Sequence, residues 1–313
     1  MQTASTYLGL GIAKLTLDLS PHPGLTQRTL PNLAAGHRKL IKALRTLPSP
    51  IQLICEATGG YEHHVLFALH QAQIPFTLVN PRQVRDFARA SGLLAKTDRL
   101  DAAVLAEYGR VFQPAATPVR TQIQERLRAL VTRRQELLGL RTQEQLRAEH
   151  HHDSFVCRHA VGLQRTLQKH LEQIETELAA LEASNAMLHA QVERLSSIQG
   201  VGQRTAWLLL AALPELGTLD RGQAAALAGL APYNHDSGPY RGQRHIAHGR
   251  PLARTALYMA ALVAARCNPV LRPLYQRLRL AGKPAKVALV ALMRKLVELA
   301  NLLLKNPQLA LSN

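Results

Sequence analysis

The sequence predicts an α/β domain, then a long helical coiled-coil stalk, then an all-α domain. Short apolar runs alternate with helical patterns up to residue 114, as in a sheet flanked by helices. Arg, Glu, Gln and Leu then dominate to residue 195, which is typical of long helices. Short turns with Gly or Pro separate the helical patterns that follow. We therefore expect three domains, at residues 1–114, 115–195 and 196–313.

The first region begins with a predicted β-hairpin. Residues 7–12 and 15–19 are short alternating runs around a tight turn, the pattern of two antiparallel strands. Strands in a hairpin, followed by strands that alternate with helices, predict a mixed sheet. The further expected elements are strands at 51–55 and 74–79, the latter stopped by Asn80-Pro81, and helices at 33–44, 61–72 and 98–112.

The stalk is predicted from an apolar seam with a spacing of about 3.5 residues. A break near residues 150–154 divides it into two long helices that form a hairpin. Such a stalk is expected to pair with a helix of the same chain or of a second copy. The seam consists of Leu167, Leu171, Ile174, Leu178, Leu181, Leu188, Val192 and Leu195.

The chain is strongly basic. It has 38 Lys and Arg against 21 Asp and Glu, which gives a formal charge of +17 and a pI near 10.5. A charge of this sign attracts polyanions, so nucleic acid is the expected partner. Aromatic residues, at 4%, are too few for a platform that stacks single-stranded bases. The 47% hydrophobic content excludes a generally disordered chain.

The sequence lacks the patterns of membrane and secreted proteins. Its longest apolar stretch, near residues 256–265, is about half as long as a bilayer span requires. The first residues do not have the basic and apolar parts of a signal peptide. Cys55, Cys157 and Cys267 are odd in number and far apart, as expected for reduced thiols. We therefore expect a cytoplasmic protein.

Three acidic residues are candidates for a metal site. Glu56 follows the predicted buried strand at 51–55. Asp98 and Asp101 are three residues apart, so on a helix they share one face. Divalent ions held by such carboxylates could clamp the attacking and leaving oxygens of a phosphoryl transfer. The alternative is structural: Asp98 caps a helix, Asp101 interacts with its dipole and Glu56 closes a turn. Asp18, on the second strand, is expected to be solvated.

A Gly-x-Gly turn before a helix predicts a contact with phosphate. Gly200 and Gly202 stand between two apolar helical patterns, in a helix-hairpin-helix arrangement, and Arg204 follows them. Glycines let the backbone approach a phosphate, which the free N–H groups of the next helix then bind. The alternative is an ordinary turn between helices.

The segment Asp236-Ser237-Gly238 contains a candidate nucleophile. A serine hydroxyl among several cations is suited to attack a phosphodiester. The alternative is an exposed turn, because Gly and Pro are frequent on both sides. The surrounding cations, which are expected to bind nucleic acid, are Arg241, Arg244, Arg250 and Arg254.

In this order the motifs resemble one family along almost the whole chain. These are the DEDD-type transposases of bacterial insertion sequences (the insertion-sequence-110 family), relatives of the Piv DNA invertase. The resemblance implies a RuvC-like, RNase H-type first domain and a C-terminal transposase domain. The matching motifs are Glu56 after its strand, Lys96-Thr97-Asp98-x-x-Asp101-Ala102, Gly200-Val201-Gly202, Asp236-Ser237-Gly238 and Arg254-x-Ala256-Leu257-Tyr258-Met259.

The resemblance also implies a mechanism and partners. Glu56, Asp98 and Asp101 match three acids of the family's metal-binding tetrad, which takes Mg²⁺. Ser237 matches the serine that attacks DNA and forms a covalent phosphoserine link. The implied function is RNA-guided site-specific recombination or transposition. The implied partners are donor DNA, target DNA, a guide (bridge) noncoding RNA, and further copies of the chain in a dimer or dimer of dimers.

One position departs from the family pattern. The pattern Gly-x-Asp-x-Ala-Lys has Asp at the end of the first strand, where this chain has Gly11. Without that carboxylate we expect the chain to bind nucleic acid but to be weak or inactive in strand exchange. An engineered change or a decayed natural copy is favoured over compensation by Asp18, because a ligand on the neighbouring strand rarely keeps its geometry. The alternative function is a catalytically inactive nucleic-acid-binding relative.

Overall fold

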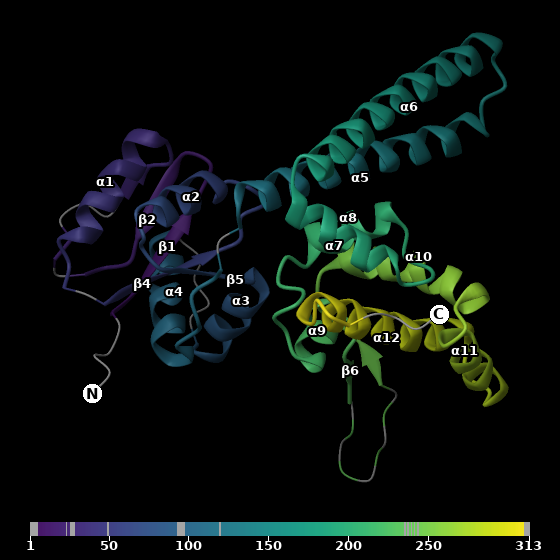
Figure 1. The fold of residues 1–313 in the computed structure, drawn as a ribbon. Coiled ribbons are helices and arrows are strands. Elements are labelled where there is room, and N and C mark those ends of the chain that lie inside the picture. Colours follow the sequence, from purple (N-terminus) through teal and green to yellow (C-terminus); the bar gives the residue numbers. More distant parts are fainter. Residues whose placement is uncertain are drawn as a thin grey trace. The chain divides into compact units, whose positions relative to one another are not determined.

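The computed structural model divides into two compact units, residues 1–119 and 120–313 (Figure 1). The first unit contains a sheet with helices on both faces, and the second is almost entirely helical. The mixed α/β region followed by a helical region confirms the expected order of fold types. For residues 98–100 only the backbone is described. The described residues are 6–22, 24–25, 29–48, 50–92, 98–118, 120–234, 236, 238, 240, 242 and 244–309.

Five strands form the sheet of the first unit, in the spatial order β3-β2-β1-β4-β5. β1 pairs antiparallel with β2, and β2 pairs antiparallel with β3. β1–β4 and β4–β5 are parallel pairs, so the sheet is mixed, as predicted. The short strand β3 was not expected, because three residues are too few to show a pattern. The bounds are β1 Thr6–Ile12, β2 Thr16–Leu19, β3 Thr29–Pro31, β4 Ile51–Glu56 and β5 Phe76–Val79.

Two helices cover each face of this sheet (Figure 1). On one face, Leu40 of α1 and Leu69 of α2 pack in the core with Leu8 and Leu10 of β1. On the other face, α3 and α4 pack over Ile54 of β4. Successive strand residues face opposite sides, so the second face of β1 is the one that carries residues 7, 9 and 11. The bounds are α1 Ala34–Arg45, α2 His63–Gln71, α3 Pro81–Ala90 and α4 Asp98–Phe112.

Helix α3 corrects the expectation for Asn80-Pro81. These two residues end a strand, as predicted, but they also begin a helix. The Asn80 side chain accepts a hydrogen bond from the Arg82 N–H at 2.9 Å, and Pro81 occupies the first helical position. Asn is a favoured N-cap and Pro is favoured at this position, so the helix signal was present in the sequence.

The predicted stalk is a hairpin of two long helices, α5 (Gln122–Ala148) and α6 (Ser154–Ala183). Leu137, Leu167 and Leu171 are buried between them, so the apolar seam pairs within the chain. An ion pair at 2.7 Å between Arg134 and Glu175 also joins the two helices. Nearer its base, the hairpin shares the main core of the second unit through residues such as Leu178.

The predicted seam does not continue in one helix to Leu195. Asn185 interrupts it and caps a separate helix, accepting a hydrogen bond from the Leu188 N–H at 2.8 Å. In the core of the second unit, α8, α10 and α12 pack together through residues that include Trp207, Leu257 and Leu296. None of the described helices is long and apolar enough to cross a membrane. The remaining bounds are α7 Ala186–Ser196, α8 Gln203–Ala212, α9 Arg221–Leu227, β6 Pro232–Tyr233, β7 His245–Ile246, α10 Pro251–Cys267, α11 Leu271–Leu280 and α12 Ala285–Lys305.

Candidate functional site

A small cavity in the first unit collects the acidic residues singled out in the sequence. It has a volume of about 80 Å³ and lies where β1, β2, β4 and α4 meet. Two of the three predicted acids line it, Glu56 from the end of β4 and Asp101 from α4. The full lining is Gly11, Ile12, Ala13, Asp18, Glu56, Thr58, Asp101 and Leu105.

Asp18 lies directly across the β1–β2 ladder from Gly11. Residues opposite each other in an antiparallel pair point to the same face, so Asp18 lines the cavity that a side chain at position 11 would enter. The expectation that Asp18 is solvated was wrong, because only 8% of it is exposed. Its Oδ1 accepts a hydrogen bond of 2.6 Å from the Thr29 hydroxyl. On the other side of β1, Leu10 pairs with Cys55, so Gly11 and Glu56 come next along the two strands.

Helix α4 lies close to β1 because residue 9 is glycine. A Cβ at Gly9 would collide with the carbonyl oxygen of Ala102. This close packing brings Asp101, the residue before Ala102, to the cavity. Asp98 is the first residue of α4, and its side chain lies outside the described part. That it shares a face with Asp101 stays a prediction from helical spacing.

The loop after β4 is closed by Glu62, a residue that the sequence reading missed. Its carboxylate accepts hydrogen bonds from the Thr58 N–H and hydroxyl and from the Gly60 N–H, at 2.7 to 3.2 Å. Burial would raise the pKa of the Glu62 carboxyl, but these bonds and one from its own N–H hold that pKa below its ordinary value. Glu62 therefore closes the turn. In the sequence analysis, the alternative to a metal site assigned this role to Glu56. The available sequence signal was a hydroxyl and two glycines just before a carboxylate.

The cavity offers the kind of ligand that a divalent cation prefers. Mg²⁺ binds carboxylate oxygens and keeps several waters, and three carboxylates from three different elements line this space. Among the residues that the structure describes, no three His, Cys, Asp or Glu side chains converge closely enough to hold an ion by themselves. The donor chemistry fits such an ion, and the Asp98 side chain is the remaining candidate ligand.

The Gly-x-Gly turn places its two glycines in different surroundings. Gly200 has a φ of 108° and packs on α10, where an added Cβ would lie 3.0 Å from the Ala260 carbonyl oxygen. Gly202 is the N-cap of α8, and an added Cβ there would meet nothing within 4 Å among the described atoms. Among the described residues, Gly200 is therefore packed against α10, whereas the Gly202 side of the turn has room for a phosphate. Arg204, in the first turn of α8, binds Glu175 at 2.6 Å.

The other predicted nucleic-acid contacts also differ in what they touch. The Arg250 guanidinium donates two hydrogen bonds, of 2.6 and 2.7 Å, to the Glu215 carboxylate and one of 2.8 Å to the Ala212 carbonyl. Arg254 donates to backbone carbonyls, whereas Arg244 is exposed. Ser237 and Arg241 lie outside the described residues. Their assigned roles stay predictions.

Ser237 lies, in the sequence, within a segment whose two ends form a short hairpin stem. Pro232 of β6 pairs with Ile246 of β7, and Tyr233 pairs with His245. Asp236 accepts a hydrogen bond of 3.1 Å from the Gly242 N–H. The stem therefore anchors both ends of this segment on the second unit.

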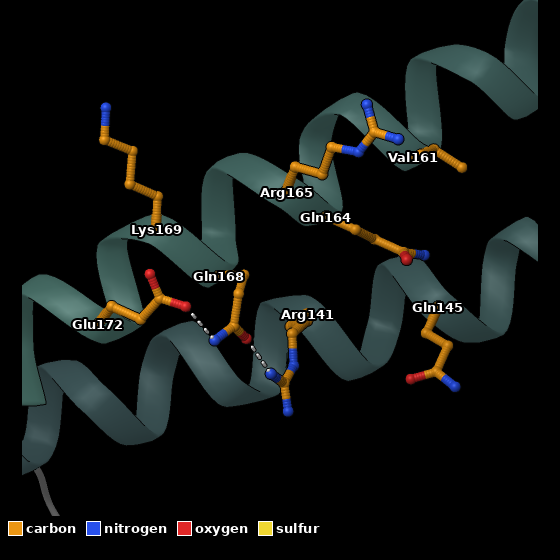
Figure 2. Close-up of a pocket in the computed structure, with 8 residues that line it drawn as sticks. All are labelled: Arg141, Gln145, Val161, Gln164, Arg165, Gln168, Lys169 and Glu172. Carbon is orange, nitrogen blue, oxygen red and sulfur yellow. Dashed lines mark hydrogen bonds between the residues drawn. The ribbon is translucent and has the colours of Figure 1, made fainter.

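The outer part of the α5–α6 hairpin carries a polar groove that the sequence reading did not single out (Figure 2). Arg141 donates a hydrogen bond of 2.6 Å to Gln168, which in turn donates one of 2.9 Å to Glu172. The groove has a volume of about 640 Å³. It is lined by Arg141, Gln145, Val161, Gln164, Arg165, Gln168, Lys169 and Glu172.

Comparison with known proteins finds transposases over most of the chain. Residues 20–157 match the DEDD-type IS110 family described as Transposase, and residues 192–276 match the Transposase IS116/IS110/IS902 family. Pilin gene-inverting proteins of Moraxella bovis and Moraxella lacunata are each 27% identical over 310 residues, or 95% of either chain. An insertion element IS110 protein of Streptomyces coelicolor is 33% identical over 148 residues, covering 45% of this chain and 36% of the relative. The first match includes Glu56, Asp98 and Asp101 but begins after Asp18.

Proposed function

Because the chain belongs to the IS110 family of transposases, we propose that it is an RNA-guided site-specific recombinase that cuts and rejoins DNA. Its substrates are donor and target DNA, and a structured guide (bridge) RNA selects both. The Moraxella relatives are named for gene inversion, which is also a site-specific rearrangement of DNA. The charge of +17 supports a protein that holds several nucleic-acid strands.

The first unit acts as a RuvC-like, RNase H-type domain. This proposal is supported by the mixed sheet, in which the β1–β2–β3 meander continues into two parallel strands. It is also supported by acids that meet at the ends of β1 and β4 under α4. Glu56, Asp98 and Asp101 would hold Mg²⁺. A bound Mg²⁺ ion would supply positive charge to the phosphate oxygens that become more negative during the reaction.

Ser237 is the proposed nucleophile, on the strength of its motif. Its Oγ forms a bond to the DNA phosphorus while the bond to one deoxyribose oxygen breaks. The serine hydroxyl loses its proton, and the leaving deoxyribose oxygen gains one to become a free hydroxyl. The product is a covalent phosphoserine link, which conserves the energy of the phosphodiester for rejoining.

The active assembly is proposed to be a dimer or dimer of dimers. The active centre would combine the acids of one protomer with Ser237 of another. The exposed outer part of the α5–α6 hairpin supports this proposal, because Leu146 and Phe155 are more than half exposed there.

One observation carries the proposal: Glu56 and Asp101, 45 residues apart in the sequence, line one cavity with the position of the missing acid. The test is covalent adduct formation with labelled DNA, guide RNA and Mg²⁺, read on a denaturing gel. Ser237→Ala should abolish the adduct and leave RNA binding unchanged, while Ser184→Ala, at the exposed end of α6, serves as the control. An undiminished adduct in Ser237→Ala would show that another residue is the nucleophile.

A catalytically inactive nucleic-acid-binding relative is the second candidate function. The observation that favours it is Gly11, which supplies no carboxylate to the cavity. Asp18 faces the same space, but its Oδ1 is bound to Thr29. We therefore propose that strand exchange by this chain is weak, and that position 11 limits it.

A further inference from the structure

The base of the β6–β7 hairpin is a close contact between two glycines. Gly229 precedes β6 and Gly249 follows β7, and both have a φ of 69°. A Cβ at Gly249 would collide with the backbone of Gly229, and one at Gly229 would collide with the carbonyl of His248. The two ends of the hairpin therefore touch backbone to backbone, in conformations that favour glycine.

His248 adds backbone strain at this contact. It has a φ of 60°, which is uncommon for a residue with a side chain and costs free energy that surrounding contacts must offset. Two contacts do so. The Tyr233 ring packs edge-to-face on the imidazole, with 5.7 Å between ring centres. The His248 carbonyl oxygen accepts a hydrogen bond of 2.7 Å from Arg254 Nη1.

Arg254 connects both ends of the hairpin. It projects from the first turn of α10, and the same Nη1 that binds His248 lies 3.4 Å from the carbonyl oxygen of Gly229. One guanidinium group thus bridges the carbonyl before β6 and the carbonyl after β7. Both contacts come from one nitrogen, so the bridge depends on the reach of the side chain. The ammonium nitrogen of lysine lies one bond nearer to the backbone than Nη1, so we expect lysine to replace arginine poorly here.

We propose that Arg254 is a positioning residue for the segment that contains Ser237. Its bridge fixes the strained base at Gly229, His248 and Gly249, and the base fixes the direction in which residues 234–244 leave the second unit. In this role the guanidinium acts on its own chain and makes no DNA or RNA contact. That this positioning matters for catalysis rests on the proposed function. The Arg254 bridge itself rests only on the two contacts described above.

Hydrogen–deuterium exchange of the unliganded full chain tests the bridge. In Arg254→Gln, amides of the stem and of residues 247–250 should exchange about tenfold faster, because the base opens locally. Amides in the centre of α8 should exchange as before. Arg254→Lys should resemble Arg254→Gln, and Arg266→Gln, at the other end of α10, is the matched control.

Nucleic-acid binding separates this role from a direct phosphate contact. The salt dependence of binding to a labelled duplex should be unchanged in Arg254→Gln, whereas loss of a phosphate contact would lower its slope by about one. Unchanged exchange at the hairpin base, or a lowered slope, would overturn the proposal. Hydrogen–deuterium exchange is measured without DNA, so its result does not depend on whether a covalent adduct forms. Failure to detect an adduct would count against the proposed function and not against the Arg254 bridge.

Discussion

Glu62 of the first unit and Glu298 of the second are buried carboxylates with opposite kinds of partner. In the first unit, Asp18 is bound by a threonine hydroxyl and Glu62 by a hydroxyl and backbone N–H groups, all of them neutral donors. In the second unit, Glu298 is bound by Arg221, Arg294 and Lys295, and Glu215 by Arg250. Glu298 and Glu215 are thus neutralised by bound cations, whereas the buried carboxylate of Glu182 in the same unit accepts hydrogen bonds from Trp207 Nε1 at 2.6 Å and Gln203 Nε2 at 3.0 Å.

This difference affects how a basic sequence should be interpreted. Arginines such as Arg250 are committed to carboxylates of the second unit, so a position in a basic stretch does not show that a residue binds phosphate. Neutral donors, in contrast, stabilise a buried carboxylate without cancelling its charge. Asp18, which lines the cavity together with Glu56 and Asp101, has such a neutral donor, the Thr29 hydroxyl, as its partner.

The largest effect is expected from Gly11→Asp, which adds a carboxylate to this cavity. Covalent adduct formation with RNA, DNA and Mg²⁺ should rise at least about tenfold, because removing even an outer support of a metal ligand typically costs that much. Binding of Mn²⁺ to the protein alone, followed by electron paramagnetic resonance, should also tighten. Glu56→Gln in the same background should abolish both gains.

The opposite outcome for Gly11→Asp would also be informative. If the unaltered chain reacts as fast as Gly11→Asp, the proposal that position 11 limits activity is wrong. Loss of that activity in Asp18→Asn would then assign the missing ligand to Asp18. The amide keeps the oxygen that Thr29 binds, so this variant removes charge with little change in shape.

The next effect concerns stability and pH in the first unit. Glu62→Gln should lower the free energy of unfolding by about 2 kcal/mol at neutral pH, since hydrogen bonds to a charged group are lost. The folded state depresses the pKa of Glu62, so its contribution is complete above the unfolded pKa and disappears as pH falls through the lower, folded value. The stabilities of the two proteins in urea titrations should therefore begin to converge as pH falls below about 4.3, the ordinary pKa of Glu. A constant difference across this range would contradict the assignment, and Asp86→Asn, on exposed α3, is the control.

A somewhat smaller effect is expected for Glu215→Gln in the second unit. Losing the two-bond contact with Arg250 should cost about 1.5 kcal/mol. Burial would raise the pKa of Glu215, but the Arg250 contact holds it below its ordinary value. This loss should shrink between about 0.1 and about 1 M NaCl, because salt screens ion pairs. The Glu62→Gln loss should stay constant, since its donors are neutral, and equal salt sensitivity would remove the contrast between Glu62 and Glu215.

The smallest effect is expected for Arg244→Ala. Arg244 is exposed near the Ser237 segment, so its removal should lower the salt slope of duplex binding by about one and leave thermal stability unchanged. Arg204→Ala, which removes a partner of Glu175, should change the slope less. Fluorescence anisotropy over a salt series measures both. The reverse order would show that the Glu175 contact does not prevent Arg204 from binding phosphate.

Sequence patterns predicted the long elements well. The bounds of α4 agree with the expected helix at 98–112, and the stalk hairpin follows from its leucine seam. Two kinds of element were missed: a very short strand, and a helix whose first residues also mark the end of a strand. The three residues of β3 show no period, and Asn80-Pro81 was interpreted only as the end of a strand.

The sequence identified two acidic residues of the candidate site, but it did not predict which residues of β1 and β2 lie opposite each other. Motif order identified Glu56 and Asp101, and both line the cavity. The position of Asp18 depends on how β1 and β2 are paired, and a shift of one residue would have turned its side chain to the opposite face. Glu62 was missed because two of its bonds come from backbone N–H groups, and the hydroxyl and glycines that precede it are common in turns of every kind.

The pairing of Gly11 with Asp18 bears on how families of this kind are surveyed. An alignment that scores each column separately would class a chain with glycine in place of the first aspartate, the position of Gly11 here, as catalytically inactive. In the folded sheet, residues 11 and 18 lie opposite each other on neighbouring strands, so their side chains share one face. We expect a survey that scores the two columns together to divide chains with glycine at the first position into those that keep a carboxylate beside it and those that have lost both.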